Sequence, residues 1–337
     1  MNEIRVILFG VGRVGSDVAR LLNARPGYRV VGAYTRNPRF DGKDLYGTQI
    51  TTNRQNVLQI PADVVVIATT SFLHDVVEDI RAAVRAGLNV IFTAEEGLFP
   101  WIVDEGLAHE IDSLGREHKV SILGAGANPG FIFDALVLTA AGATWNVDSI
   151  HGRRVVDCSH FSATILRRLG FGYSREEFEA GAAAGRIYGH IGFPQSISLV
   201  AASIGVKLER IEKSLEPFIA EKPYRMDNLN IKPGETVGFL QKAVGYVDGK
   251  PWYVADFIGH ADPASAGFEQ KDSIDIEGYQ PIHLVVSPGF NPHLTSAAIL
   301  ANSLQRIKNA KPGLVTIADL PPAFPSVTTR ELLDQKR

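Results

Sequence analysis

The feature that most constrains the fold is a glycine-rich turn near the start of the chain. The apolar run Ile4 to Phe9 leads into Gly10-Val11-Gly12-Arg13-Val14-Gly15, and an amphipathic stretch from Ser16 to Leu22 follows. A G-x-G-x-x-G pattern between a strand and a helix is the arrangement that binds a dinucleotide. The sequence therefore predicts a strand, a phosphate-binding turn and a helix, although the same pattern also occurs in turns that bind no nucleotide.

Each glycine of this turn has a separate physical reason. Gly10 permits the turn, Gly12 leaves space for a pyrophosphate beside the backbone, and Gly15 lets the helix pack closely against the strand. The phosphates would meet the unpaired N–H groups and the positive dipole end of that helix. Arg13 is either a solvated side chain or a cation over the phosphates. We expect the whole turn, with Val11 and Val14, to bind the cofactor.

The end of the second predicted strand indicates which cofactor is bound. This strand runs from Tyr28 to Tyr34 and is followed by Thr35 and Arg36. NAD-selective versions of the fold place an acidic residue about twenty residues beyond the glycines, where it holds the ribose 2′-hydroxyl. A hydroxyl and a guanidinium suit a 2′-phosphate instead. The sequence therefore favours NADP, with NAD as the alternative in which Arg36 is only solvated.

Two further strand ends carry polar side chains. The β-branched run Val64 to Ile67 precedes Thr69-Thr70-Ser71, and the run Leu88 to Phe92 precedes Glu95-Glu96. Such runs are typical of parallel strands covered on both faces, and ligands of these sheets bind beyond the carboxyl ends of the strands. We therefore predict an α/β fold, a Rossmann-type doubly wound parallel sheet. Thr69, Thr70 and Ser71 would line the cofactor crevice or cap the next helix.

Glu95 and Glu96 are the main candidates for catalysis. They follow a strand that ends at Phe92, so the sheet would hold them near the nicotinamide. Neighbouring side chains of an extended chain point in opposite directions, so at most one should face the cofactor. The alternative is that both carboxylates only stabilise a helix N-terminus, which contributes about 0.3–1 kcal/mol.

A change of pattern at Asn128 marks the predicted end of the first domain. Asn128 would cap a helix that has Pro129 at its first position and runs to about Ala141, because asparagine and proline favour these two positions. Asn128 is also a candidate cofactor-binding residue.

The remaining chain predicts a second domain of the α+β class. A mostly antiparallel sheet is indicated by long alternating stretches at Val147 to Val156, Thr236 to Gly245, Trp252 to Ile258 and Ile274 to Val286. Several helical segments are expected between the first two of these stretches. A final helix, opened by Asn291-Pro292, would pack back on the first domain. We therefore expect a dinucleotide-binding domain of residues 1–130 together with 291–337, and a substrate and dimerisation domain of residues 131–290.

Polar and aromatic residues of the second domain are candidates for the substrate site. Arg154 would bind a substrate carboxylate, or it would belong to an interface ion network. His160 would act as an acid or base near neutral pH, or be structural. Phe161 and Phe171 would form pocket walls, or belong to the core.

Composition excludes several classes of function. A net charge of −3, with basic residues spread along the chain, leaves no footprint for nucleic acid or a membrane surface. Cys158 is the only cysteine, which excludes an intrachain disulfide, and His260, His283 and His293 lack metal-type spacing, so we expect no metal. The longest apolar run, Val64 to Ala68, is too short to cross a bilayer. We expect a cytoplasmic protein.

Four stretches together carry a family resemblance. They are the glycine turn, Thr93-Ala94-Glu95-Glu96, Asn128-Pro129-Gly130-Phe131 with Asp134, and Asp157-Cys158-Ser159-His160 leading to Gly170-Phe171-Gly172. With them the chain resembles the 2,4-diaminopentanoate dehydrogenases and the related native amine dehydrogenases, whose nucleotide domain is similar to that of dihydrodipicolinate reductase. Members commonly have Cys-Glu-Glu-Leu where this chain has Ala94-Glu95-Glu96-Gly97.

The resemblance implies an NAD(P)-dependent amine dehydrogenase that acts on CH–NH2 groups. It would combine a ketone or aldehyde with ammonia, reduce the resulting iminium ion with hydride from nicotinamide, and deaminate a primary amine or diamino acid in reverse. A carboxylate suits this centre because it takes a proton from ammonium and stabilises the cationic imine. Similarity to sugar oxidoreductases with Glu-Lys-Pro at the same strand end favours Glu96 over Glu95. Family members tend to be homodimers formed through the second domain's sheet.

Two other functions are the alternatives. One is an NADPH-dependent reductase or dehydrogenase of a hydroxy compound, which would not need ammonia. The other is a sensor that binds NADPH without turnover, against which Glu96 and a complete second domain argue.

Overall fold

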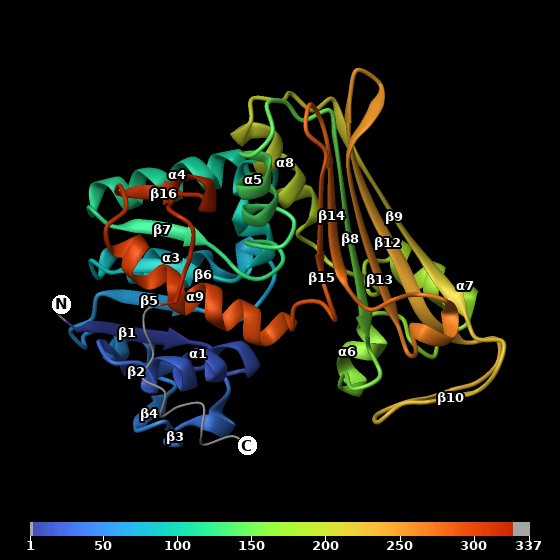
Figure 1. Cartoon of the computed structure of the whole chain (residues 1–337). Helices are drawn as coiled ribbons and strands as arrows, with labels where there is room; N and C mark the ends of the chain where they lie inside the picture. The colour runs from blue at the N-terminus through green and yellow to red at the C-terminus, as the bar shows by residue number, and fades with distance from the viewer. Residues whose placement is uncertain (1–2, 326–337) are drawn as a thin grey trace. The chain divides into compact units, whose positions relative to one another are not determined.

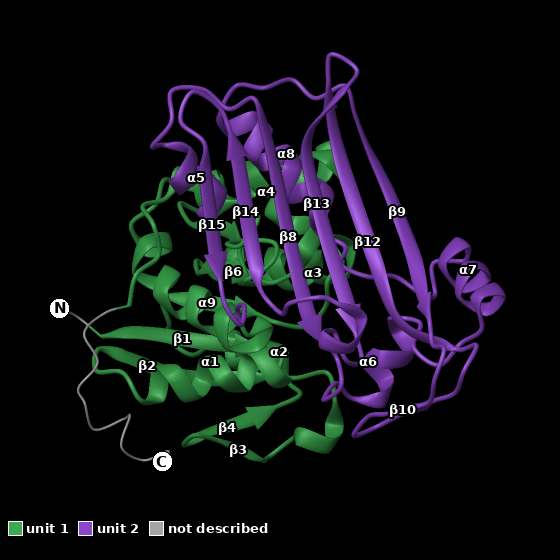
Figure 2. Ribbon diagram, turned by 45° about the vertical axis from the view of Figure 1, so that its right-hand side comes forward, with its two compact units in different colours: residues 1–135, 291–337 green, residues 136–290 purple. Residues whose placement is uncertain are grey.

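The computed structural model describes residues 3–325, and its contacts divide the chain into two compact units (Figure 1, Figure 2). Unit 1 comprises Met1–Ala135 and Asn291–Arg337, and unit 2 comprises Leu136–Phe290. Residues 326–337, which the sequence places with the first domain, lie outside the described residues. The predicted fold class is confirmed, because unit 1 holds a Rossmann-type sheet and unit 2 a mostly antiparallel one.

The described part of unit 1 contains an eight-stranded sheet in the order β16-β7-β6-β5-β1-β2-β4-β3. Neighbouring strands are parallel except β3 and β4. The strands are β1 (Ile4–Phe9), β2 (Tyr28–Tyr34), β3 (Asp44–Leu45), β4 (Thr48–Thr51), β5 (Val64–Ile67), β6 (Asn89–Phe92), β7 (Ser121–Gly124) and β16 (Gly313–Val315). The order reverses at β1, which lies between β2 and β5, and ligands of such sheets bind at the carboxyl edge of this switch point.

Helices cover both faces of this sheet (Figure 1). They are α1 (Arg13–Asn23), α2 (Arg54–Leu58), α3 (Leu73–Arg85), α4 (Glu105–Glu117) and α9 (Pro292–Lys308), with the short 3₁₀ helices η1 (Pro38–Phe40), η2 (Glu95–Leu98), η3 (Pro100–Ile102) and η5 (Ile317–Asp319). Val6 and Leu8 of β1 share a buried cluster with α1 and α9, whereas Ile7 and Phe9 share the opposite cluster with α3 and α4. This alternation follows from the two-residue period of a strand.

Asn291 begins α9 as the sequence predicts. Its side chain accepts hydrogen bonds from the N–H groups of His293 and Leu294, both at 3.1 Å. Leu300 and Leu304 are fully buried in the cluster that α9 shares with α1. The helix therefore belongs to the core of unit 1.

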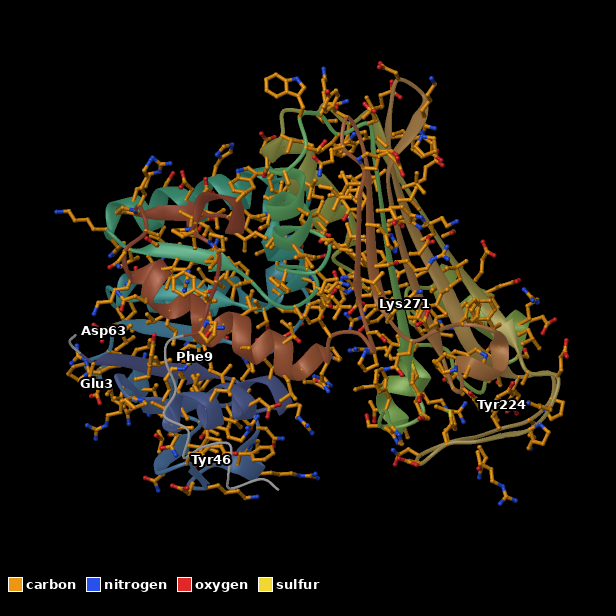
Figure 3. All side chains as sticks on the ribbon, viewed as in Figure 1. Glu3, Phe9, Tyr46, Asp63, Tyr224 and Lys271 are labelled. Atoms are coloured by element: carbon orange, nitrogen blue, oxygen red, sulfur yellow. The ribbon has the colours of Figure 1, made fainter. Side chains whose placement is uncertain are left out.

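At the amino edge of the sheet, Asp63 (labelled in Figure 3) forms ion pairs with two basic side chains. Its carboxylate accepts a 2.8 Å hydrogen bond from the Arg5 N–H and lies 3.1 Å from Lys308 Nζ at the end of α9. These contacts hold β1, β5 and α9 together on the side away from the carboxyl ends of the strands.

Unit 2 contains a six-stranded sheet in the order β15-β14-β8-β13-β12-β9 (Figure 2). Only β8 and β13 pair in parallel within it. Its elements are α5 (Ala135–Ala141), β8 (Ser149–Asp157), α6 (Ala163–Arg168), α7 (Arg175–Ala183), α8 (Phe193–Ser203), β9 (Arg210–Ile219), β10 (Tyr224–Arg225), β11 (Asn230–Ile231), β12 (Thr236–Val247), β13 (Lys250–His260), η4 (Ala264–Ala266), β14 (Asp272–Glu277) and β15 (Ile282–Val286), with α5 starting one residue before the boundary. Helix α8 packs against β12 and β13.

The predicted helix start at Pro129 is wrong. The Asn128–Pro129 peptide bond is cis, and residues 129–134 form turns, so α5 begins only at Ala135. Asn128 is therefore no helix cap. The Asn128 side chain is therefore available to bind a ligand.

Candidate active site

The glycine turn connects β1 to α1 with the geometry that a phosphate requires. Gly10 has a φ of +92°, and a Cβ there would lie 2.4 Å from the Ala68 carbonyl oxygen. A Cβ on Gly15 would lie 2.0 Å from the Gly10 carbonyl oxygen, whereas a Cβ on Gly12 would meet no atom within 4 Å. Gly12 is the N-cap of α1 and provides no side-chain cap. The turn is thus closed at two glycines and open at the third, as a bound pyrophosphate demands.

Arg13 lies at the mouth of this turn. Its Nε donates to Asp17 Oδ2 at 3.1 Å, while 70% of the side chain is exposed. His293, in the first turn of α9, has its pKa lowered by burial and then by the positive charge of Arg13. The guanidinium is therefore held at the amino end of α1, close to His293.

The polar residues after β2 differ in exposure. Thr35 is buried, and its Oγ1 accepts from the Asn37 N–H at 3.2 Å. Arg36 is more than half exposed, and its NH2 lies 2.7 Å from Asp79 Oδ2. The same carboxylate binds Arg54 through its other oxygen. Neither Arg54 nor Asp79 was identified from the sequence, because they come from α2 and α3.

The three hydroxyl residues after β5 contact the glycine turn, α3 and the acidic pair. Thr69 lies beside the glycine turn, since a Cβ on Gly10 would be 2.9 Å from its methyl carbon. Thr70 Oγ1 donates to Asp75 Oδ2 at 3.2 Å. Ser71 Oγ donates to Glu95 Oε1 at 2.8 Å. These side chains therefore line the edge between the glycine turn and the acidic pair.

Glu95 and Glu96 both face the loop that joins β5 to α3. Ser71 donates to Glu95, and the Leu73 N–H donates to Glu96 Oε2 at 2.7 Å. The parity of an extended strand does not apply to this pair, because the chain has left extended geometry here. They lie in the 3₁₀ helix η2, where successive residues are separated by about a third of a turn and can serve the same side.

Glu96 is held through one carboxylate oxygen. Its Oε2 accepts the first N–H of α3, whose N-cap residue Phe72 provides no side-chain cap. Within residues 3–325, its Oε1 accepts no hydrogen bond. Glu96 thus combines the helix-stabilising role with an oxygen available to a ligand. For Glu96, a catalytic role and the stabilisation of a helix N-terminus are therefore compatible.

The loop around Asn128 follows β7, whose last residue lies against the 3₁₀ helix that carries the acidic pair. A Cβ on Gly124, where β7 ends, would lie 2.2 Å from the Gly97 carbonyl oxygen of η2. Ser296 Oγ accepts the Ala127 N–H at 3.1 Å, and Asp134 Oδ2 accepts the Gly130 N–H at 2.8 Å. The loop is therefore fixed on both sides of Asn128.

Asn128 contains a buried acceptor without a donor. Among the described residues, none donates a hydrogen bond to its Oδ1. Leaving such an oxygen unsatisfied costs about 1–3 kcal/mol, so it is expected to have a partner when a ligand binds. The carboxamide of a nicotinamide offers N–H donors of the required kind, and the residues present fit this cofactor.

The structure contradicts Arg154 as a substrate-binding residue. Its side chain is 5% exposed, and NH1 lies 3.1 Å from Asp272 Oδ1. NH2 donates to the Phe290 carbonyl oxygen at 2.6 Å. Because its charge is already neutralised inside unit 2, Arg154 is part of an internal ion pair. It is neither a surface interface group nor an open carboxylate-binding site.

The other predicted residues of unit 2 separate into surface and core. His160 is exposed, and a 2.6 Å hydrogen bond with Asp227 raises its pKa. Phe161 is partly buried against the cluster that contains Phe171. Phe171 is fully buried, with its ring edge-on to Phe239, so the structure favours the core alternative for this residue. Phe161 and His160 remain candidates.

Two kinds of feature are absent from residues 3–325. No group of three or more His, Cys, Asp or Glu side chains in this range is arranged to hold a metal ion. No helix in the same range is long and apolar enough to cross a membrane.

The fold and the site define a class of protein. A doubly wound sheet with an open glycine turn at its switch point, and with polar side chains at the same edge, is the architecture of an oxidoreductase with a nicotinamide dinucleotide cofactor. The chain belongs to the 2,4-diaminopentanoate dehydrogenase family. The model of the 2,4-diaminopentanoate dehydrogenase C-terminal domain matches residues 131–333. A 2,4-diaminopentanoate dehydrogenase of Acetoanaerobium sticklandii is 34% identical, over 95% of this chain and 94% of the relative.

Two amine dehydrogenases are similar to this chain at lower identity. The enzyme of Streptomyces virginiae is 23% identical over 94% of this chain and 96% of its own length. The structure of the amine dehydrogenase from Mycobacterium smegmatis shares the fold with a TM-score of 0.83, at 24% identity, over 96% of this chain and 98% of that one. The family resemblance and the class of oxidoreductase acting on CH–NH2 groups are therefore confirmed.

Proposed function

We propose that this chain is an amine dehydrogenase that prefers NADP and interconverts a primary amine with a ketone or aldehyde plus ammonia. The observation that carries the proposal is Glu96, with one oxygen fixed by the Leu73 N–H and the other without a donor in the described chain. This carboxylate lies at the edge of the sheet where a nicotinamide binds. The names of the relatives, 2,4-diaminopentanoate dehydrogenase and amine dehydrogenase, support the same reaction.

The reaction joins a carbonyl compound, ammonium and NADPH to give a primary amine, water and NADP⁺. The bound nicotinamide supplies the hydride in this direction and accepts it in reverse. In our proposal, Glu96 Oε1 takes a proton from ammonium, so that ammonia can attack the carbonyl carbon. The same carboxyl returns the proton as water leaves, and its negative charge stabilises the cationic imine. Glu95 accepts a hydrogen bond from Ser71, and in our proposal this contact helps to hold Glu96 in position.

The remaining residues bind the cofactor in this proposal. The turn Gly10–Gly15 receives the pyrophosphate, with Thr69 and Thr70 along the same edge. Asn128 Oδ1 would accept a hydrogen bond from the carboxamide N–H of the nicotinamide, which would orient the ring. Thr35 and Arg36 favour the 2′-phosphate of NADP over the 2′-hydroxyl of NAD.

The proposal extends to partners and compartment. The partners that we propose are a small carbonyl or amine substrate and ammonia. We also propose a homodimer formed through the six-stranded sheet of unit 2, on the family resemblance alone. Phe161 and His160 are the substrate-side candidates in unit 2. The compartment we propose is the cytoplasm.

Reduction of NADP⁺ by a panel of primary amines tests the proposal. The panel starts with 2,4-diaminopentanoate, the substrate named by the relative of 34% identity, and pairs amines that carry a carboxylate with amines that lack one. We expect NADPH and ammonia to appear in equal amounts with at least one amine. NADPH formation from hydroxy compounds but from no amine would favour the hydroxy-compound dehydrogenase. Tight cofactor binding without any turnover would favour the sensor.

A further inference from the structure

Two arginines from different parts of unit 1 flank one buried carboxylate. Arg36 NH2 lies 2.7 Å from Asp79 Oδ2, and Arg54 NH1 lies 2.7 Å from Asp79 Oδ1. The Asp79 side chain is fully buried, whereas those of Arg36 and Arg54 are 56% and 36% exposed. The carboxylate thus lies beneath two guanidinium groups that reach the surface.

The pairing of β2 with β4 brings the two arginines together. Ala33 pairs with Ile50 and Tyr34 with Thr51, so the carboxyl ends of both strands lie side by side. Arg36 follows the end of β2, and Arg54 opens α2 shortly after β4 ends. Both arginines are therefore placed at the edge where the adenosine ribose of a dinucleotide lies in this fold.

Each guanidinium contacts α3 through a single terminal nitrogen. Arg36 NH2 also donates to the Asp75 carbonyl oxygen at 3.3 Å, and Arg54 NH1 to the Glu78 carbonyl oxygen at 3.5 Å. The Asp75 carboxylate accepts from Thr70 instead. Since a guanidinium carries five N–H donors, each fork retains donors for a second ligand.

We propose that Arg54 is a second cation for the adenosine 2′-phosphate, and that Asp79 is the positioning residue for both arginines. A phosphomonoester carries nearly two negative charges and three acceptor oxygens, which suits two planar forks. The two guanidinium groups together carry one positive charge more than the Asp79 carboxylate between them can neutralise. Asp79 restricts both long side chains before the ligand arrives, and this lowers the entropy lost on binding. The inference rests on the NADP preference in the proposed function.

The test measures binding to the full-length protein without substrate. Dissociation constants are determined for NADP⁺, NAD⁺, 2′,5′-ADP and 5′-AMP with the variants Arg36→Ala and Arg54→Ala. Arg29→Ala is the matched control, because Arg29 is an exposed arginine near the amino end of the same strand, β2. We expect Arg54→Ala to weaken NADP⁺ and 2′,5′-ADP about 10- to 100-fold, and NAD⁺ and 5′-AMP at most about 2-fold. Arg29→Ala should leave all four nearly unchanged.

Two further variants separate recognition from folding. Arg54→Lys keeps a positive partner for the buried Asp79 but loses the planar fork, so it should remain folded and still weaken NADP⁺ several-fold. Asp79→Asn removes the charge that holds both arginines, and we expect several-fold weaker binding of NADP⁺ with little change for NAD⁺. Melting temperatures with and without cofactor show whether each variant is folded.

The outcomes distinguish this inference from the proposed function. Wild-type protein that binds NAD⁺ as tightly as NADP⁺ contradicts the NADP preference itself, and with it the inference. An NADP⁺ preference that survives Arg54→Ala and Arg54→Lys unchanged contradicts the role of Arg54. Unchanged or tighter NADP⁺ binding by folded Asp79→Asn contradicts the role of Asp79. The expected pattern supports the inference even where no amine is oxidised.

Discussion

Glu96 Oε2 accepts a 2.7 Å hydrogen bond from the N–H of Leu73, the first residue of α3. The positive end of the helix therefore holds the carboxylate that we propose as the proton carrier, a contribution of about 0.3–1 kcal/mol. The same bond fixes the side chain while leaving Oε1 for chemistry. A positioned group is more effective in catalysis than a mobile one, because less orientational freedom is lost in the transition state.

Glu96→Gln should lower reductive amination about 10²- to 10⁴-fold, the usual contribution of a positioned acid or base. The glutamine oxygen can still accept the Leu73 N–H, so we expect the fold and the NADP⁺ affinity to remain nearly unchanged. Glu95→Gln is the matched control, and it should mainly change stability or cofactor placement. Steady-state rates at saturating ammonia and calorimetric NADP⁺ titrations measure both effects. A fully active Glu96→Gln beside a folded, inactive Glu95→Gln would reverse the two roles.

Asn128→Ala should weaken NADP⁺ by several-fold, because one neutral hydrogen bond contributes about 0.5–1.5 kcal/mol. The loss should concern only ligands that carry a nicotinamide. Binding of 2′,5′-ADP, which lacks this group, is therefore the internal control and should not change. Equal losses for NADP⁺ and 2′,5′-ADP would mean that Asn128 supports the loop rather than the nicotinamide.

Local features of the site were predictable from the sequence, whereas contacts between distant segments were not. The roles of Gly10, Gly12 and Gly15 follow from three glycines in one turn, and the structure shows the close approaches and the open space that they require. The sequence does not predict Arg54 and Asp79 as site residues, because strand pairing and the packing of α3 bring them to Arg36. A one-dimensional pattern contains no signal for either event.

The acidic pair and the second sheet show two other limits. Strand parity cannot choose between Glu95 and Glu96, because the chain leaves extended geometry after β6 and the short 3₁₀ helix η2 places both beside the same loop. Strand β9 (Arg210–Ile219) was missed because charged residues interrupt its apolar alternation. Arg154 appeared suitable for substrate because its partner Asp272 lies 118 residues away.

Asp272→Asn should destabilise unit 2 by about 3–5 kcal/mol, since it leaves Arg154 buried without a counter-charge. Asp275→Asn is the matched control on the same strand, because Asp275 is partly exposed and pairs with His283 at the surface. Its cost should be below about 1 kcal/mol. Denaturant unfolding measures both. Similar small losses for the two variants would show that the Arg154–Asp272 pair does not stabilise the fold.

Binding of NADP⁺ should raise the pKa of His293. In the free protein this pKa is lowered by burial and by Arg13, while Asp17 opposes the shift. A pyrophosphate at the glycine turn adds negative charge near Arg13 and favours the protonated imidazole. Cofactor binding then takes up protons, so the affinity should increase as the pH falls through the range between the two pKa values. NMR titration measures the shift, with exposed His109 as the control. An unchanged His293 pKa would place the phosphates elsewhere.

The dependence of NADPH oxidation on ammonia tests the central claim most directly. Purified full-length protein is mixed with NADPH and a ketone or aldehyde that matches an amine oxidised in the panel, with and without ammonium. The amine dehydrogenase that we propose should oxidise NADPH only when ammonium is present, and should form one equivalent of primary amine for each NADPH consumed. NADPH oxidation at the same rate without ammonium, with an alcohol as the product, would contradict the claim.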